Sequence, residues 1–457
     1  MKRKCGEKKM LLNNCIRKVP RIVCGISIII ILGIMLLSFE VAAAVPIEQW
    51  NKTFGGPFDD YAFTVQETVD GGYIIGGEYG HDPNEEFGPY AWLIKTNSNG
   101  SQQWNKTDTD QGLWSHAIDV QQTADSGYIY GLNFGAYQWD SFEARKTNAL
   151  GERIWSYYHD GFDVSGFVQK TNDGGFIIAL NDGAYEPMYH ALIKLNGAGI
   201  EQCNKTFYDK YLLDVQQTRD GGFIISNMHE LIKTDGAGNV LWNKSFSLDF
   251  NHSRQTIDGG YILVGSTNSI GANGSDTYIL KTDTFGNQQW IKTFGTSIND
   301  YGEDIQQTTD GGYIIAGWAG STSYSYAKLI KTDASGNKQW EKTFGGAGFD
   351  HAKSVNQTSD GGYIVAGAGD TNSFGAGGYD AWLVKFTVGL PKTGDINGNG
   401  QVTLVDAIYL AKHVGGFSGY ETISADGDIN GNGQVTLVDA IYLAKHVGGF
   451  IGYEKIY

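Results

Sequence analysis

Three short motifs recur along the chain at intervals of roughly fifty residues, between Ile47 and about Val388. Repeats of this length are typical of β-propeller blades, each of which is one small sheet. The first motif, T-x-D-G-G-[YF]-I-[IV], contains Asp70, Asp125, Asp173, Asp220, Asp258, Asp310 and Asp360. The second, L-I-K-T, contains Lys95, Lys146, Lys194, Lys233, Lys281, Lys331 and Lys385. The third, W-N-K-T-F, contains Trp50, Trp104, Trp155, Trp242, Trp290 and Trp340, with Cys203 at the remaining position. Each motif therefore indicates seven units.

Each unit is predicted to contain four antiparallel strands. The Asp-Gly-Gly after the first strand is a hairpin signal, because Gly readily adopts the positive φ that the turn requires. The repeats begin with a lone Trp-led strand, Ile47–Phe54, and end with a third strand, Ala381–Phe386, that has no successor. We expect the first strand to complete the last unit, which closes a ring without free sheet edges. The prediction is a mainly β protein with a seven-bladed β-propeller over residues 45–388.

The repeats also resemble known propeller families. The T-D-x-x-G-x-x-x-W turn resembles the tryptophan-docking repeats of quinoprotein-type propellers, and T-x-D-G-G resembles the Asp-box hairpins of sialidase-like propellers. The whole pattern is similar to the repeats of secreted surface proteins in bacteria and archaea. These resemblances imply a propeller but no particular reaction.

Residues 1–44 have the order of an export signal: basic residues, an apolar run from Ile22 to Phe39, and Ala42-Ala43-Ala44. They are predicted to be a signal peptide cleaved after Ala44, or an uncleaved membrane anchor that would be the chain's only membrane contact. Either reading places the rest outside the cell, secreted or at the cell surface. The remaining residues include 26 basic and 48 acidic side chains, a net charge of −22. Such acidity argues against a nucleic-acid partner.

The two ends of the predicted ring differ in character. The tight turns after the first and third strands share one end, here called the tight-turn face. The longer connections share the other end, the variable-loop face, where aromatic and acidic residues collect. These connections are Glu78–Tyr90, Asn133–Phe142, Asp182–Tyr189, Trp318–Tyr326 and Gly369–Tyr379. Such a surface suits glycan or protein binding, although the aromatics could instead pack the loops.

No catalytic residue is predicted, because no motif of a metalloprotease, serine hydrolase or clustered His/Cys metal site occurs. A pair of carboxylates for glycoside hydrolysis stays open, since their separation depends on the fold. The prediction for enzymatic activity is therefore uncertain and leans toward none.

The strongest local signal lies near the C-terminus, where GDINGNGQVTLVDAIYLAKHVGGF occurs twice, from Gly394 to Phe417 and from Gly427 to Phe450. Each copy fits D-x-[DN]-x-[DN]-G-x₅-[DE], in which alternate positions supply oxygen ligands to Ca²⁺. The pattern predicts two calcium ions. The ligands of the first loop are Asp395, Asn397, Asn399, Gln401, Thr403 and Asp406. Those of the second are Asp428, Asn430, Asn432, Gln434, Thr436 and Asp439.

This segment resembles a type I dockerin, the calcium-dependent module that anchors secreted proteins to cohesin domains. The resemblance implies a domain over residues 394–457, after a linker at 389–393, with two loop–helix units. The family's partner-selecting positions map onto Leu404, Val405, Leu437 and Val438, and its basic helix positions onto Lys412 and Lys445. Many dockerins have Ser or Thr at the first set, so a cohesin of another specificity is expected. Asn399 and Asn432 replace a common Asp, which predicts weaker calcium affinity.

The leading hypothesis is an exported, non-catalytic propeller that its dockerin attaches to a cohesin-bearing surface or cellulosome-like complex. Its variable-loop face would bind a polysaccharide, a surface glycan or a protein. The alternatives are a carbohydrate-active enzyme or accessory protein in polysaccharide degradation, and a structural spacer. Because the two copies are identical, we expect two equivalent docking surfaces related by near two-fold symmetry.

Overall fold

The computed structural model describes residues 45–81, 89–108, 114–136, 139–161, 164–183, 189–208, 211–272, 274–321, 323–346, 348–370, 378–387, 404–416, 429 and 435–447. Residues 43–392 form one compact unit, and the residues from Thr393 onward belong to another. The predicted leader (1–44) and linker (389–393) lie outside the described residues. Among the described ranges, no helix is both long and apolar enough to cross a membrane.

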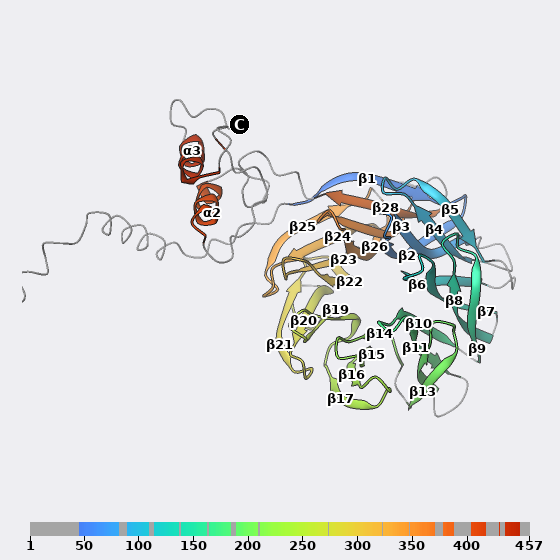
Figure 1. The fold of residues 1–457 in the computed structure, drawn as a ribbon. Helices are drawn as coiled ribbons and strands as arrows, with labels where there is room; N and C mark the ends of the chain where they lie inside the picture. The colour runs from blue at the N-terminus through green and yellow to red at the C-terminus, as the bar shows by residue number, and fades with distance from the viewer. Residues whose placement is uncertain are drawn as a thin grey trace, which may run out of the picture. The chain divides into compact units, whose positions relative to one another are not determined.

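The larger unit consists of seven four-stranded antiparallel sheets arranged in a ring (Figure 1). This confirms the prediction of a seven-bladed β-propeller. Blades 1 to 6 are built from consecutive strands, beginning with β2, and blade 7 combines β26, β27 and β28 with β1.

Within a blade, the four strands run in order from the centre of the ring to its rim. The innermost strands are β2 (Asp59–Glu67), β6 (Trp114–Gln122), β10 (Ser165–Lys170), β14 (Asp214–Gln217), β18 (Phe250–Gln255), β22 (Asn299–Gln307) and β26 (Asp350–Gln357). The second strands are β3 (Tyr73–His81), β7 (Tyr128–Ala136), β11 (Phe176–Asp182), β15 (Phe223–Ser226), β19 (Tyr261–Thr267), β23 (Tyr313–Gly320) and β27 (Tyr363–Asp370). The third strands are β4 (Tyr90–Thr96), β8 (Trp139–Thr147), β12 (Tyr189–Leu195), β16 (Glu230–Thr234), β20 (Asp276–Thr282), β24 (Ser325–Thr332) and β28 (Tyr379–Thr387). The outermost strands are β5 (Gln102–Thr107), β9 (Arg153–Asp160), β13 (Glu201–Tyr208), β17 (Val240–Ser245), β21 (Gln288–Phe294), β25 (Lys338–Phe344) and β1 (Ile47–Phe54).

The ring closes as the sequence predicts. β1 pairs antiparallel with β28, in a register that places Ile47 opposite Thr387 and Phe54 opposite Ala381. The first strand of the chain therefore supplies the outer edge of the last blade, and its pairing with β28, with one irregularity between Glu48 and Trp50, closes the ring.

The repeated Lys and Asp form one ion pair in every blade. Lys331 of β24 is buried and donates to both carboxylate oxygens of Asp310 and to the carbonyl oxygen of Thr332. The N···O distances of the seven pairs lie between 2.8 and 3.0 Å. The same Asp accepts the backbone N–H two residues later, as Asp310 does from Gly312. The pair therefore ties the first hairpin turn to the third strand, and both series are architectural.

The turn itself needs a left-handed residue. Gly71 has φ 76°, and Ser126, which replaces Gly in blade 2, is held at φ 64°. Glycine adopts this region without strain, whereas a side chain makes it unfavourable.

The repeated Trp joins neighbouring blades. Trp50 of blade 7 packs edge-on against Tyr73 of blade 1, with ring centroids 5.8 Å apart. The Trp50 ring also lies so close to Gly100 of blade 1 that a Cβ at that position would clash with it. Five more blades repeat this edge-on contact. Cys203 pairs with Lys194, as Trp50 pairs with Lys385, so it occupies the Trp position. Its thiol donates to the carbonyl oxygen of Ala237 in the next blade.

Two of the predicted connections were wrong. In Trp318–Tyr326, β23 continues to Gly320 and β24 begins at Ser325, with Ala319 opposite Tyr326. Asn133–Phe142 was expected to be an irregular loop, but β7 continues to Ala136 and β8 begins at Trp139. Asn133 pairs with Phe142 and Gly135 with Asp140. Asn and Gly are weak strand formers, but pairing with a partner strand outweighs that preference.

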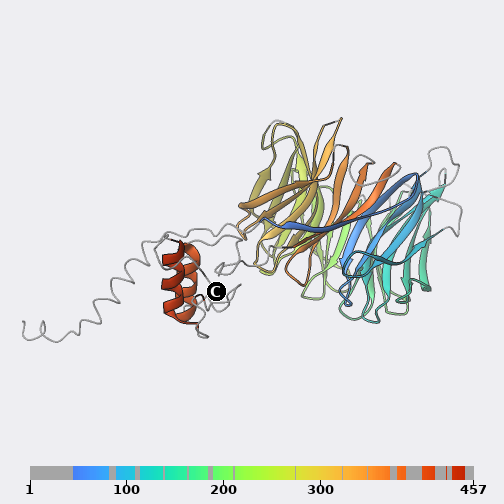
Figure 2. The same cartoon turned by 90° about the horizontal axis from the view of Figure 1, so that it is seen from above.

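The C-terminal unit contains two helices, α2 (Leu404–Val414) and α3 (Leu437–Val447), with the same sequence. They lie side by side in both Figure 1 and Figure 2. The fold is therefore mainly β, followed by a short helical region, as predicted.

Candidate functional site

The helix pair packs through equivalent positions of its two copies. Ala407 and Leu410 of α2 and Ala440 and Leu443 of α3 are buried together, with Ile429 beside them. Identical residues meeting across one interface are what a near two-fold arrangement requires. The expectation of such symmetry therefore has a physical basis in this core.

An acidic residue is buried in the first turn of each helix. Asp406 and Asp439 are fully inaccessible to solvent. The carboxylate of Asp439 accepts hydrogen bonds from the backbone N–H and the hydroxyl of Thr436, at 2.9 and 3.0 Å. Thr436 and Asp439 thus cap the start of α3, where the partial positive charge of the helix favours an anion.

These carboxylates fit the closing ligand of a calcium loop. A buried carboxylate is costly unless it is neutralised or hydrogen-bonded, and Ca²⁺ binds carboxylate oxygens. Within the described ranges, no group of three His, Cys, Asp or Glu is arranged to hold a metal ion. The other predicted ligands lie outside the described residues: Asp395, Asn397, Asn399, Gln401, Thr403, Asp428, Asn430, Asn432 and Gln434.

The predicted docking positions lie at the ends of the same helices. Leu404 and Leu437 begin α2 and α3 and are 54% and 52% exposed. Lys412 and Lys445 lie in the last turns and are partly exposed. Val405 and Val438 follow the two leucines in the helices, but their side chains are outside the described part of the structure. Each helix therefore presents an exposed leucine at its start and a partly exposed lysine in its last turn, at matching positions.

On the ring, aromatic side chains gather at the variable-loop end of the inner strands. In blades 6 and 7, Trp318 is stacked between Tyr301 and His351, with centroids 4.1 and 4.3 Å away. The Trp318 indole N–H donates to Glu303, which also accepts from Lys353. Both faces of the Trp318 ring are covered by Tyr301 and His351. Trp318 therefore packs the two blades together and has no free face on which a sugar could stack.

A second aromatic group continues around the same end. Tyr61 stacks on Phe63 of its own strand and on Tyr379 of blade 7, while His116 of blade 2 meets Phe63 edge-on. His116 also lies 3.0 Å from the carboxylate of Glu78. These two groups form an arc across blades 6, 7, 1 and 2.

More exposed rings occur at the variable-loop end of blades 3 and 4. Tyr208 ends β13 and is 59% exposed, and Tyr211 precedes β14 and is 48% exposed. The Tyr211 hydroxyl lies 3.1 Å from that of Ser165, and its ring meets His190 edge-on. An accessible ring with a fixed orientation is what sugar stacking needs.

One pair of carboxylates meets at the closing seam. Oxygens of both Asp60 and Asp380 would clash with a Cβ added at Gly55. Burial, with a smaller contribution from the charge of Asp380, raises the pKa of Asp60 to about 6. Both residues are buried, and Asp60 accepts backbone N–H groups from Gly56 and Gly80. This pair is part of the seam and is not open to a glycosidic substrate.

A ring of side-chain hydrogen bonds, which the sequence did not reveal, joins the blades at the tight-turn end. The residue before the repeated Thr of the T-x-D-G-G motif in one blade accepts a backbone N–H from the turn of the preceding blade, as Gln122 does from Val69 at 2.8 Å. The same kind of hydrogen bond, here called a latch, joins the backbone N–H of one residue to the side-chain oxygen of another in five further pairs: Asn172 and Gln217, Arg219 and Gln255, Ile257 and Gln307, Thr309 and Gln357, and Ser359 and Glu67. The recurring Gln before T-x-D-G-G was the available signal.

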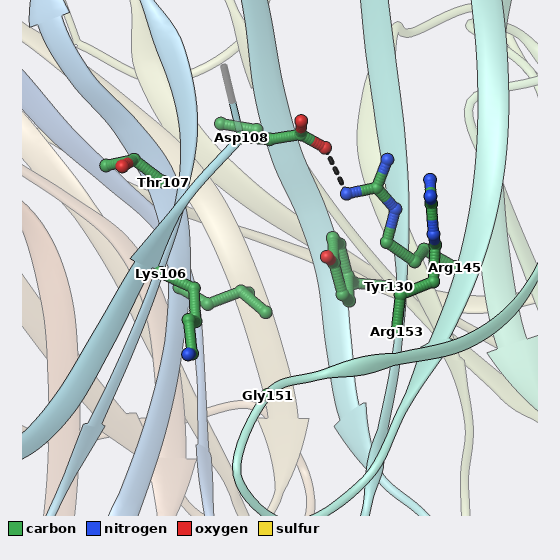
Figure 3. A pocket seen from close by; sticks show the side chains of 9 residues that line it. Lys106, Thr107, Asp108, Tyr130, Arg145, Gly151 and Arg153 are labelled. Carbon is green, nitrogen blue, oxygen red and sulfur yellow. Dashed lines mark ion pairs between the residues drawn. The ribbon is translucent and has the colours of Figure 1, made fainter. Parts of the chain in front are cut away.

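A small pocket of about 130 Å³ lies between blades 1 and 2. Figure 3 shows Arg145 reaching toward Asp108 beside Tyr130, and the two charged groups form an ion pair. Arg145 also donates to both oxygens of Glu143. Its charge is already neutralised within the protein, so this pocket is a buried polar contact between blades.

The chain was compared with known proteins and solved structures. Three solved structures are similar at low identity. The WD40 domain of Neurospora crassa Pan2 is 11% identical, with a TM-score of 0.49 over 75% of this chain and 97% of that one. BamB from Moraxella catarrhalis is 10% identical, with a TM-score of 0.41 over 74% and 99%. A Bacteroides caccae protein of unknown function is 11% identical, with a TM-score of 0.40 over 63% and 94%. At these values the similarities bear on neither ligand nor partner.

No curated protein matches the sequence. Residues 393–448 match the family described as Dockerin type I domain. The chain therefore combines a seven-bladed β-propeller with a C-terminal dockerin type I domain.

Proposed function

We propose that the chain is a non-catalytic propeller which its dockerin attaches, in a calcium-dependent manner, to a cohesin domain on an extracellular surface or complex. Dockerin domains bind calcium and dock to cohesins in general, and they are typical of extracellular assemblies. The observation that carries the proposal is the match at residues 393–448, together with the identical helices α2 and α3.

The calcium would be held by the twelve predicted ligands, six in each loop. Asp406 and Asp439, buried at the helix starts, would close the two loops. Bound calcium would supply the positive charge that these loops need to fold against the helices. Leu404, Val405 and Lys412 would form one docking surface, and Leu437, Val438 and Lys445 the other.

The variable-loop face would bind a glycan or a protein. Its exposed rings at Tyr208 and Tyr211, the second with the Ser165 hydroxyl beside it, support a sugar-stacking role. The covered ring of Trp318 limits that role to part of the face. The exported location rests on the predicted leader and on the usual setting of dockerins.

Docking is tested by capture of the full chain on a panel of immobilised cohesin domains, with calcium and with a chelator. We expect at least one cohesin to retain the chain only with calcium. A chain that lacks residues 394–457 should not be retained, while its ring stays folded. Retention of that truncated chain, or equal retention with chelator, would contradict the proposal.

The symmetry of the two docking surfaces is tested separately. Replacing Leu404 and Val405 by Asp should leave binding nearly intact, because the second surface is equivalent. Replacing Leu437 and Val438 as well should abolish it. Loss of binding after the first pair alone would show that only one surface docks.

A further inference from the structure

We propose that the central channel of the propeller is a binding site for a small hydroxylated carboxylate, of the size and chemistry of a sugar acid. This site lies on the inner strands and opens at the tight-turn face, so it is separate from both the dockerin and the variable-loop face.

The channel contains a cavity of about 500 Å³. This volume falls within the range of roughly 300–1,000 Å³ that small-molecule sites occupy. Its lining comes from the inner strands and from the turns that follow them, in all seven blades. The cavity is therefore on the axis of the ring, which Figure 1 shows surrounded by the inner strands.

The lining is suited to hydroxyl groups. Half of the residues that line the cavity are Gln or Asn. A carboxamide has two donor hydrogens and two acceptor sites, so a residue that forms one contact between blades keeps others for a ligand. Gln66, for example, uses its oxygen to accept the backbone N–H of Gln122. A polyol can pair with such a wall through both donors and acceptors.

Two cations at the tight-turn end favour an anion there, and the two acidic residues of the same lining, Asp119 and Asp304, interact with Arg254. Lys170 ends β10 and Arg219 lies in the turn after β14. The Lys170 ammonium donates to the carbonyl oxygen of Gln122, and the Arg219 guanidinium to that of Ile257. Within the described residues, neither forms an ion pair. Arg254, deeper in the channel, contrasts with them because it pairs with Asp214. The chain as a whole carries a net charge of −16, so two unpaired cations at one opening are unusual.

Lys170 departs from the pattern that the other six blades share. The other six blades have Gln or Glu at the equivalent position. In each of them, that side chain accepts a backbone N–H from the preceding blade. An ammonium group has no acceptor, so Lys170 cannot accept a backbone N–H from the turn of blade 2. Lys170 instead donates across the same blade boundary to the carbonyl oxygen of Gln122, so the direction of the hydrogen bond is reversed and a positive charge is added at the channel mouth.

A sugar acid is preferred over a simple inorganic anion because the cavity has few cationic side chains and many neutral carboxamides. Two cations suit one carboxylate, whereas many neutral carboxamides suit several hydroxyls. A phosphate or sulfate ion would leave most of the lining without a partner.

The test uses glucuronate as the probe, titrated into the full-length chain by calorimetry, with glucose, phosphate and sulfate as comparisons. We expect glucuronate to bind with a Kd of about 1 mM or tighter. Glucose, phosphate and sulfate should each bind at least about tenfold more weakly, since each lacks the carboxylate or the hydroxyls.

Lys170→Gln and Arg219→Gln should each weaken glucuronate binding at least about tenfold. Gln at position 170 can accept the backbone N–H that Gln or Glu accepts in the other blades, in place of the bond that Lys170 donates to Gln122, so the first variant should unfold at about the same temperature as the native chain. Lys338→Gln on the outer strand β25 removes the same charge far from the channel and should bind normally. The proposal is overturned if glucuronate does not bind, if Lys170→Gln binds it normally, or if sulfate or phosphate binds equally well.

Discussion

The backbone N–H of Ser359 donates a 2.7 Å hydrogen bond to the carboxylate of Glu67, a residue 292 positions earlier in the chain. The Ser359 hydroxyl donates to the other oxygen of the same carboxylate at 2.8 Å. This contact closes the inner rim of the ring between blades 7 and 1, while β1 closes the outer rim on β28. Ring closure thus depends on residues from the two ends of the propeller.

Deletion of Ile47–Phe54 is therefore expected to destabilise the propeller strongly. It removes the whole outer strand of blade 7, exposes the edge of β28 and uncovers Tyr73, which Trp50 contacts. Thermal unfolding followed by tryptophan fluorescence should show a large fall in the transition temperature. Deleting residues 394–457 is the matched control and should leave that transition nearly unchanged. Equal effects of the two deletions would show that β1 does not close the ring.

The Lys–Asp pairs predict a second difference in stability. Asp310→Ala leaves the ammonium of Lys331, which is buried, without its carboxylate. Since Asp310 itself is half exposed, we expect a loss of about 2 kcal/mol, less than the cost of breaking a fully buried pair. Lys338→Ala breaks the exposed pair with Glu341 and should cost below about 0.5 kcal/mol. Urea unfolding of both variants measures the two values, and equal losses would contradict an architectural role.

Acid should weaken the ring through the same carboxylates. Burial acts to raise the pKa of Asp70, but hydrogen bonds from Thr68 and Lys95 outweigh it and lower that pKa to about 2. Asp125 and Asp173 behave alike, each at about 2. A lowered folded-state pKa stabilises the fold above the unfolded value and loses that effect as the pH falls. Stability should therefore drop between about pH 4 and pH 2, as thermal unfolding at a series of pH values would show. A stability that is constant across this window would refute the assignment.

The carboxyl group of Asp119 should have the opposite effect, so that stability falls as the pH rises toward neutral. Its backbone is held at φ 53°, and one of its carboxylate oxygens is buried with no hydrogen-bond partner among the described residues. Burial, and then the charge of Asp214, raises the pKa of Asp119 to about 7. A raised folded-state pKa favours the fold at acid pH, and this contribution is lost as the pH rises through about 7. Asp119→Asn should remove that loss and be the more stable protein at about pH 8. Parallel pH–stability curves for the two proteins would contradict this.

Much of the fold could be predicted from the sequence because one unit is repeated seven times. The unpaired strands at the two ends of the repeats led to β1 as the closing strand, and the recurring Lys, Asp and Trp led to the contacts within and between blades. Asn133–Phe142 was misjudged because its composition is that of a loop while its partner strand extends the ladder. The stacking of Trp318 between Tyr301 and His351 depends on two adjacent blades, so the order of residues along the chain could not show it.

A candidate site could be proposed from the sequence where the chemistry is local. Calcium ligands follow one another at alternate positions of a short loop, so their spacing is visible in the sequence. The channel is different, because Lys170 and Arg219 come from two adjacent blades and line the same cavity only when those blades pack together. Lys170 stands out when the residue before T-x-D-G-G is compared among the seven blades, because it alone has a side chain with no hydrogen-bond acceptor.

The central claim, that the C-terminal domain is a calcium-dependent docking module, is tested most directly by calcium titration of the full-length chain. Calorimetry should show two calcium ions bound per chain, accompanied by a rise in helical circular dichroism. Changing Asp395 and Asp428 to Ala should abolish both signals, while the transition of the propeller stays unchanged. No calcium uptake by the native chain, or undiminished uptake by the double variant, would contradict the account.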